Sequence, residues 1–259
     1  MKERTLTFQQ FITQESPCDY YQDGRLATFE VARAQSSSPI QLYDALSLQG
    51  YRRQGTLAYR PRCKHCACCI PSRVRIDGFK PDRTMRKIWR RNQDLSIRLV
   101  RSSSELSKEN YELYQRYEHS RHAASPMANY TKTEFLNAVF SSNVDTVALE
   151  YRAEGELVLT AIADILSHGI SAVYAYFDPD ISKKRSLGTF SILKEIQITQ
   201  QTGKGRYLYL GFWLHGFPGM EYKARFSPFE VFWKERWQTL EDCESEIHAH
   251  SQRLEASLS

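Results

Sequence analysis

One segment, residues 170–191, constrains the fold of this chain more than any other. Its β-branched and aromatic residues alternate up to Tyr176 and Phe177, which predicts a strand. Residues 178–180, Asp-Pro-Asp, end that strand, because a residue before proline avoids the helical region and proline offers no N–H. Three cations follow, and after Gly188 apolar residues recur at helical spacing. The sequence therefore predicts a strand, a basic turn and a helix over residues 187–202.

This arrangement suits phosphate binding. The first N–H groups of a helix have no partner inside the helix, and the helix dipole is positive there. The Arg185-x-x-Gly188 spacing is similar to half of the pyrophosphate loop of the acyl-CoA N-acetyltransferase fold, but Phe190 stands where that motif has a small residue. An ordinary turn with solvated lysines is the alternative. The candidate phosphate-binding residues are Lys183, Lys184, Arg185 and Gly188.

Composition sets broad limits. The chain has 259 residues, 41% of them hydrophobic, which is enough for one large or two modest domains with a real core. Its longest apolar runs are too short to cross a membrane, and the first residues lead into no signal-peptide pattern. We therefore expect a cytoplasmic protein with no membrane partner.

Positive charge is concentrated in one stretch. Residues 52–91 contain thirteen Lys or Arg and only two acidic residues, whereas the whole chain has a net charge of +5. Such clustering is typical of a site for a polyanion, and aromatic residues are interleaved with the arginines. A solvated basic face without a partner is the alternative.

Four cysteines fall within seven residues, at positions 63, 66, 68 and 69. The Cys63-x-x-Cys66 spacing places two thiolates on one metal, and Cys18 would complete a set of four if its loop returns to this segment. Zinc and an iron–sulfur cluster both suit cysteine ligands. Buried free thiols are the alternative, while disulfides are disfavoured without a secretory signal. The candidate metal ligands are Cys18, Cys63, Cys66 and Cys69.

The second half of the chain predicts an α/β arrangement. Residues 107–122 and the capping box Thr131-x-x-Glu134 predict two helices. Residues 146–151, 157–165 and 170–177 then predict an antiparallel meander, followed by the helix of 187–202 and a strand over 207–214. This is the element order of an N-acetyltransferase-like domain. We predict a Cys-rich basic α+β domain over 1–95 packed on an N-acetyltransferase-like domain over 96–240, with a polar tail over 241–259.

Several motifs in this order resemble the arginyltransferase-type aminoacyl-tRNA–protein transferases, in particular the bacterial aspartate/glutamate leucyltransferases. The first half contributes residues 18–20, 50–55, 59–61, Cys63-x-x-Cys66-x-x-Cys69-x-Pro71-x-Arg73 and residues 90–92. The second half contributes residues 114–117, 176–180, 185–188, 210–214 and Met220-x-Tyr222-Lys223. Many relatives have tyrosine at Phe212 and Trp213, and their first-loop CxxC is reduced here to Cys18.

The resemblance implies transfer of leucine from Leu-tRNA to the α-amine of proteins that begin with Asp or Glu, which marks them for degradation. The implied partners are aminoacyl-tRNA and these proteins, with no DNA, a monomeric state and no cofactor for the chemistry. As hypotheses, Asp178 orients or deprotonates the amine, and Tyr176 or Tyr222 donates to the oxyanion or leaving oxygen. Arg73, Arg75, Arg90 and Arg91 would bind tRNA backbone. Lys223, Arg225 and Arg121 are the candidates for the acceptor carboxylate.

Three other interpretations stay open. An arginine donor would need an acidic pocket, and residue physics alone does not choose between arginine and leucine. A metal-dependent RNA-binding module without catalysis would explain residues 52–91 but would leave the segment around Asp178 without a role. An ordinary acetyl-CoA acetyltransferase is disfavoured by the incomplete pyrophosphate loop and by the basic N-terminal half.

Overall fold

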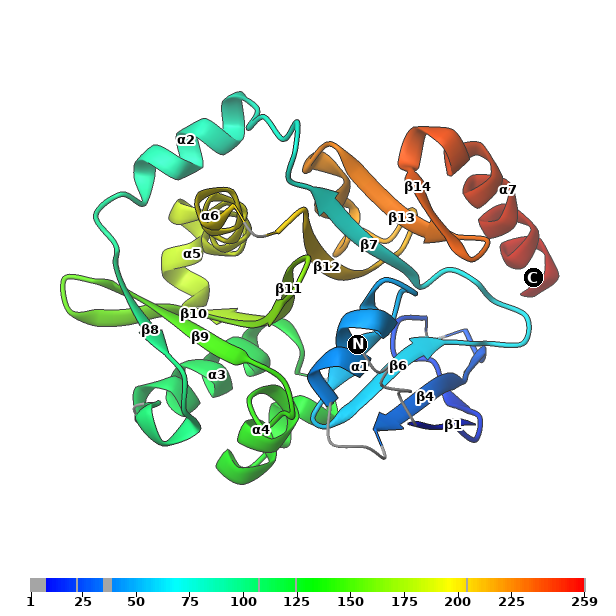
Figure 1. The fold of residues 1–259 in the computed structure, drawn as a ribbon, viewed down its shortest axis with the longest axis horizontal. Helices are drawn as coiled ribbons and strands as arrows, with labels where there is room; N and C mark the ends of the chain where they lie inside the picture. The colour runs from blue at the N-terminus through cyan, green and yellow to red at the C-terminus, as the bar shows by residue number, and fades with distance from the viewer. Residues whose placement is uncertain are drawn as a thin grey trace, which may run out of the picture. The chain divides into compact units, whose positions relative to one another are not determined.

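The computed structural model describes residues 8–21, 23–34, 39–106, 108–123, 125–203 and 205–258. The chain forms two compact units, one made of residues 1–79 and 209–259 and the other of residues 80–208. Both contain helices and strands, so the fold is mixed α/β (Figure 1). The predicted domains 1–95, 96–240 and 241–259 are defined differently from these units and stay a prediction.

Unit 80–208 is built on four strands in the order β11-β10-β9-β8. They are β8 (Ser96–Val100), β9 (Thr146–Ala153), β10 (Glu156–Leu166) and β11 (Gly169–Phe177). β10 pairs antiparallel with both β9 and β11, and β8 pairs antiparallel with β9. The predicted meander is confirmed, since its turns fall at the glycine-containing positions that separate the apolar runs.

Helices cover both faces of these strands (Figure 1). On one face lie α3 (Lys108–Arg121) and α4 (Lys132–Val139), and the predicted capping box of Thr131 and Glu134 begins α4. Ser107, the predicted first residue of the helix before it, lies outside the described residues. Tyr114, Phe135 and Tyr176 form the centre of the core on this face. The short 3₁₀ turns Ser103–Glu105 and Pro126–Asn129 flank α3.

The other face carries α2 (Arg83–Arg91), α5 (Pro179–Arg185) and α6 (Leu187–Thr202). Phe190 of α6 packs against Tyr151 of β9 and Trp89 of α2. The predicted helix over 187–202 is confirmed. Residues 179–185 form a short helix instead of the expected turn, because Asp178 caps it and Pro179 is well suited to a first helical position.

The other unit contains a sheet in the order β1-β4-β6-β5 and the helix α1 (Pro39–Ser47). Its strands are β1 (Phe8–Ile12), β4 (Phe29–Ala34), β5 (Arg52–Gln54) and β6 (Leu57–Pro61). Between β1 and β4 in the chain, β2 (Ser16–Pro17) and β3 (Leu26–Ala27) form a separate two-stranded sheet. In the four-stranded sheet β4 pairs antiparallel with β1 and β6, and β5 pairs antiparallel with β6. This sheet carries the arginines of β5 and β6.

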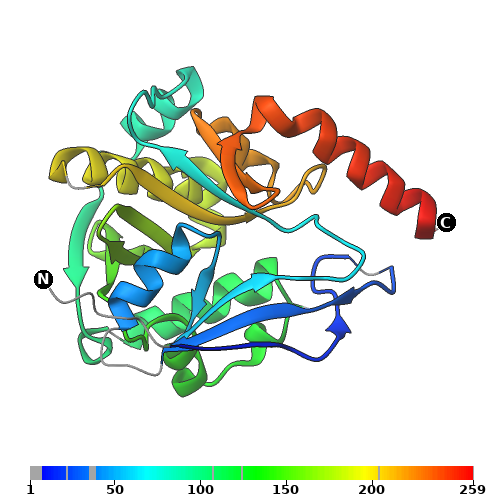
Figure 2. The ribbon, with the colours of Figure 1, turned by 45° about the vertical axis from the view of Figure 1, so that its right-hand side comes forward.

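The same unit holds a second set of strands in the order β14-β13-β7-β12, and a terminal helix (Figure 2). They are β7 (Ile70–Arg75), β12 (Tyr207–Trp213), β13 (Phe229–Trp233) and β14 (Arg236–Thr239), with the 3₁₀ turn η3 (Glu221–Arg225) before β13. The expected polar tail is the helix α7 (Leu240–Leu258), which buries Cys243 and Ile247. In the described part of the chain, every helix is too short or too polar to span a membrane.

Candidate functional site

Asp178 lies at the carboxyl end of β11 and caps α5. Its Oδ1 accepts hydrogen bonds from the backbone N–H groups of Asp180 and Ile181, at 3.0 and 2.9 Å. Its Oδ2 lies 3.2 Å from the guanidinium of Arg116, on α3. The carboxylate therefore has a structural role as a cap, and one of its oxygens faces a cation that sequence reasoning did not assign.

Tyr176 lies two residues earlier and is fully buried among aromatic side chains. Its hydroxyl donates to Oδ1 of Asn110 at 2.8 Å, and Thr160 donates to the same oxygen. Asn110 in turn donates to Glu150 at 2.7 Å. Burial raises the pKa of Tyr176, so the phenol stays protonated as a hydrogen-bond donor in this network.

The basic segment after β11 is joined to the end of α2. Arg185 forms a two-bond ion pair with Asp94, at 2.8 and 2.9 Å, and its backbone carbonyl accepts from Asn92. The guanidinium of Arg91 donates to the carbonyl of Lys184. Arg185 and Arg91 thus hold α2 and α5 together, while Gly188 packs its α-carbon against the ring of Phe177.

The remaining cations on these two helices point into solvent. The apolar side of α2 buries Met85 and Ile88, so the cationic positions three and four residues apart lie on the opposite side. Lys183 is exposed but pairs with Asp180 at 2.8 Å. Besides Arg91, the exposed cations of α2 and α5 are Arg83, Arg86, Lys87, Arg90, Lys183 and Lys184, of which Arg86 also donates to the carbonyl of Pro81. A sequence reading of helical period could have found Arg83, Arg86 and Lys87.

Arg73 and Arg75 of β7 have different surroundings. Arg73 is 5% exposed, and its guanidinium binds Glu230 at 2.7 Å and lies 4.1 Å from the ring centre of Trp237. Arg75 is exposed and lies 3.9 Å from the same carboxylate. As folded, Arg73 belongs to the interior of its unit.

The candidates for the acceptor carboxylate are dispersed. Lys223 of η3 is 9% exposed, and its amino group donates to the backbone carbonyl of Phe212. Burial and the positive charge of Arg52 lower the pKa of Lys223 to about 7. Tyr222 and Arg225 on the same turn are exposed. Arg121 belongs to the other unit, where it lies over the ring of Phe177.

The four candidate metal ligands line one cavity. Cys18, Cys63, Cys66 and Cys69 all border it, together with Tyr20, Tyr21 and Arg25. The loop of Cys18 is brought there by its N–H bond to the carbonyl of Arg25. Among the described residues, no group of three or more His, Cys, Asp or Glu side chains is arranged to hold a metal ion as it stands.

The thiols differ in acidity. A hydrogen bond from Cys68, together with the guanidinium of Arg25 at 3.8 Å, lowers the pKa of Cys66 to about 5 despite its burial. Burial and the neighbouring thiols raise the pKa of Cys69. The thiolate form is therefore favoured at Cys66, and thiolate sulfur is a ligand that soft metal ions prefer.

Two buried acids in unit 80–208 lack full pairing. Glu118 of α3 accepts from the hydroxyl of Tyr174, but its Oε2 has no hydrogen-bond partner among the described residues. Glu195 of α6 is 2% exposed, its Oε2 is likewise unpaired among them, and burial raises its pKa to about 8. Sequence reasoning assigned neither residue a role, since both sit in ordinary helical patterns.

Comparison with known proteins identifies the class of this chain. The family model for the N terminus of arginine-tRNA-protein transferase matches residues 16–87, and the model for the C terminus matches residues 109–233. The chain belongs to the arginine-tRNA-protein transferase family. The two matches together span both the cysteine cavity and the segment around Asp178.

Curated relatives extend this result over nearly the whole chain. It is 37% identical over 236 residues to the aspartate/glutamate leucyltransferase of Nitrosococcus oceani, covering 91% of this chain and 97% of the relative. It is 38% identical over 229 residues to that of Paramagnetospirillum magneticum, covering 88% and 92%. Among solved structures, the C-terminal DUF2156 domain of an Agrobacterium fabrum protein is 15% identical with a TM-score of 0.49, over 64% of this chain and 58% of that one.

Proposed function

We propose that this protein is an aminoacyl-tRNA–protein transferase that moves leucine from Leu-tRNA to the α-amine of proteins beginning with Asp or Glu. The observation that carries the proposal is the near full-length similarity to aspartate/glutamate leucyltransferases, at 37% identity over 97% of one relative. The proposed consequence is degradation of the marked protein in the cytoplasm. Arginine is the alternative donor, because the family model is named for arginine transfer.

The proposed fold for the transfer domain is N-acetyltransferase-like. Its support is the succession of α3, α4, three antiparallel strands, α6 and β12, which is the element order expected for that fold. In this proposal aminoacyl-tRNA takes the place of acyl-CoA, and a Cys-rich basic α+β domain accompanies the transfer domain. The protein is proposed to be a monomer and not to bind DNA.

The proposed tRNA surface is the exposed side of α2 and α5. Its support is the set of solvent-facing cations on two helices that are joined through Arg91 and Arg185. Backbone phosphates neutralised by lysine and arginine give a salt-dependent affinity. Arg73 would have to leave Glu230 to reach a phosphate, so its contact with tRNA stays a prediction, as do those of Arg75 and Gly188.

The proposed reaction is attack of the protein's α-amine on the ester carbonyl of aminoacyl-tRNA. The C–N bond forms, the bond to the 3′ oxygen of tRNA breaks, and one proton moves from the amine to that oxygen. An ester is already reactive, so positioning and proton removal should supply most of the rate. We assign Asp178 to orient or deprotonate the amine and the exposed Tyr222 to donate to the oxyanion. Tyr176 could donate only after leaving Asn110, so its role stays a prediction.

The chemistry as proposed uses no cofactor. A structural zinc ion or iron–sulfur cluster would be held by Cys18, Cys63, Cys66 and Cys69, whose thiols share one cavity. Its contribution would be to fix the loops of residues 18–25 and 63–69. Metal analysis of the purified protein, repeated for Cys63→Ser, tests this part of the proposal.

The experiment that tests the function offers the protein tRNA charged with leucine or, separately, arginine. Acceptors are peptides that begin with Asp, Glu, Lys or Ala. Leucine on only the Asp and Glu peptides is the expected result. Arginine on the same peptides would change the donor, and transfer from neither with tRNA still bound would favour an RNA-binding module.

The role of Asp178 is tested by two substitutions. Asn caps helices about as well as Asp, so Asp178→Asn keeps the cap and removes the charge, whereas Asp178→Ala removes both. As a base, Asp178 predicts loss of transfer in both variants. As a cap only, it predicts near-normal transfer for Asp178→Asn and a loss of stability for Asp178→Ala.

A further inference from the structure

Two cations of different segments meet at Phe212 of β12. The guanidinium of Arg52, from β5, lies against the α-carbon of Gly211: a Cβ there would stand 2.3 Å from its Nη1. Its Cζ lies 5.4 Å from the ring centre of Phe212. The amino group of Lys223, from η3, donates to the backbone carbonyl of that same Phe212.

The backbone at Gly211 makes room for this arrangement. Its φ of +74° lies in the region that favours glycine, and the absence of a side chain leaves space for the arginine. Ser72 of β7 donates to the carbonyl of Gly211 at 2.9 Å, which holds this stretch in place. The close approach of Arg52 is therefore a built feature of β12.

The two cations influence each other electrostatically inside the protein. Burial and the positive charge of Arg52 both disfavour the charged form of Lys223. Glu221, two residues from Lys223, accepts from the backbone N–H of Gly216 at 2.6 Å, while Glu30 pairs with Arg60 and Arg62 and Glu230 pairs with Arg73. An anion placed between Arg52 and Lys223 would relieve their repulsion and restore the ammonium form of the lysine.

The surroundings favour a small planar anion. The rings of Tyr59 and Phe212 pack edge to face beside Arg52, with 5.9 Å between their centres. The positive charge of Arg52 also acts on the nearby phenol of Tyr20. Lys223 is 9% exposed, so a single small carboxylate suits this position better than the phosphodiester backbone of a nucleic acid. A guanidinium binds a carboxylate through two parallel hydrogen bonds.

We infer that Arg52 and Lys223 together bind the side-chain carboxylate of the acceptor's first residue, and that Arg52 determines the selection of Asp and Glu. This inference rests on the proposed function, since it concerns the acceptor of that reaction. Among the predicted candidates it selects Lys223, and it adds Arg52 as the residue that supplies the bidentate contact.

The test measures binding and transfer with peptides that begin with Asp or with Asn, which has the same shape without the charge. Arg52→Gln should weaken binding of the Asp peptide by about 10- to 100-fold, the usual effect of losing a hydrogen bond between charged groups. Its binding of the Asn peptide should stay unchanged, so the Asp-to-Asn ratio falls toward one. Arg52→Lys should recover part of the ratio, and Lys223→Met should lower it.

The matched control is Arg53→Gln, on the same strand, where the guanidinium donates to the carbonyl of Gly55. This control should keep the wild-type ratio, which is independent of how much protein is folded. An unchanged ratio in Arg52→Gln overturns the inference. So does weaker tRNA binding with an unchanged ratio, because the arginine would then hold a phosphate.

Failure of the proposed function has a different signature. It would appear as absence of leucine transfer by the wild-type protein to every peptide. Peptide binding is measured without tRNA, so a preference for the Asp peptide that depends on Arg52 would support the carboxylate site even in that case.

Discussion

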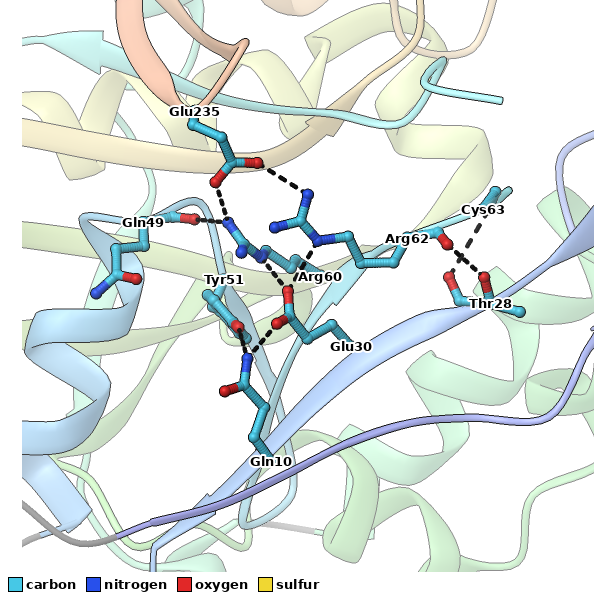
Figure 3. A network of polar contacts seen from close by, with 9 residues as sticks. All are labelled: Gln10, Thr28, Glu30, Gln49, Tyr51, Arg60, Arg62, Cys63 and Glu235. Carbon is cyan, nitrogen blue, oxygen red and sulfur yellow. Dashed lines mark hydrogen bonds and ion pairs between the residues drawn. The ribbon is translucent and has the colours of Figure 1, made fainter. Parts of the chain in front are cut away.

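The arginines of the two units differ in what surrounds them. In unit 1–79 with 209–259, Arg60 and Arg62 lie between Glu30 and Glu235, at 2.6 to 3.0 Å (Figure 3). Arg73 is bound to Glu230 in the same unit. In unit 80–208, the cations along α2 are exposed, and two of them also donate to backbone carbonyls: Arg86 to Pro81 and Arg91 to Lys184. One continuous basic stretch of sequence thus has two different physical roles.

The difference shows why a charge count along the sequence overstates a polyanion site. Thirteen cations and two acids occur in residues 52–91, but the acids that pair with the buried Arg60 and Arg73 come from residues 30, 230 and 235. A buried guanidinium requires such a partner, since an isolated buried charge is very costly. Only the cations that remain in solvent are available to a nucleic acid.

The largest expected effect comes from removing the exposed charges of α2. Substituting Arg83, Arg86, Lys87 and Arg90 together with Gln should weaken tRNA binding on the order of 1,000-fold at about 0.1 M salt, because four phosphate contacts are lost. The slope of log affinity against log salt should become shallower by about three. Titration by filter binding or fluorescence at several salt concentrations measures both.

The control removes the same number of charges from exposed positions in the other unit: Arg33, Lys234, Arg236 and Arg253. Its affinity should stay within a few-fold of wild type. Equal losses in both variants would mean that net charge, and not the surface of α2, governs the affinity, and the comparison between the units would fail.

The next effect concerns stability. Glu230→Gln leaves Arg73 buried without its counter-charge, and removing one partner of a buried pair costs about 3–5 kcal/mol. Urea unfolding should show this loss, while tRNA affinity of the folded protein should change little. Glu244→Gln, at an exposed position of α7, is the control and should be close to neutral. A large gain of tRNA affinity in Glu230→Gln would assign Arg73 to the tRNA surface, because the arginine would be released from its carboxylate partner.

A buried acid without a full set of partners should make the stability of the protein depend on pH. The pKa of Glu195 is raised to about 8 in the folded protein, above its ordinary value of 4.5. Between these values the folded protein keeps a proton that the unfolded chain has released. The free energy of unfolding should therefore fall as pH rises, by up to about 1.4 kcal/mol per pH unit from this group.

Glu195→Gln does not titrate, so its unfolding free energy should lack this contribution. In urea unfolding at pH 5, 6 and 7, the unfolding free energy of the variant should increase relative to that of the wild type as pH rises. A constant difference across this range would mean that the carboxyl group is ionised at neutral pH and has a partner in solution.

The smallest expected effect distinguishes two neighbouring lysines of α5. Lys184→Gln should lower tRNA affinity about fivefold, the share of one phosphate contact at moderate salt. Lys183→Gln should lower it less, because Asp180 already neutralises part of that charge at 2.8 Å. The same binding titration serves for both, and a larger effect at Lys183 would show that its pair with Asp180 opens when tRNA binds.

Local patterns in the sequence determined many elements of this protein. The capping box at Thr131 and Glu134, the helix over 187–202 and the three-strand meander were all predicted from residues a few positions apart. The order of the motifs also indicated the family that the comparisons confirm. Such features are set by capping, periodicity and turn chemistry, which act over one or two turns of chain.

Tertiary structure alone decided which charged and reactive groups meet. It placed Cys18 beside Cys63, Cys66 and Cys69, and it placed Arg52 beside a lysine 171 residues further along the chain, at position 223. It also made Arg73 a buried partner of Glu230, while leaving the cations of α2 in solvent. Burial and ion pairing depend on segments distant in sequence, so no local pattern can specify them.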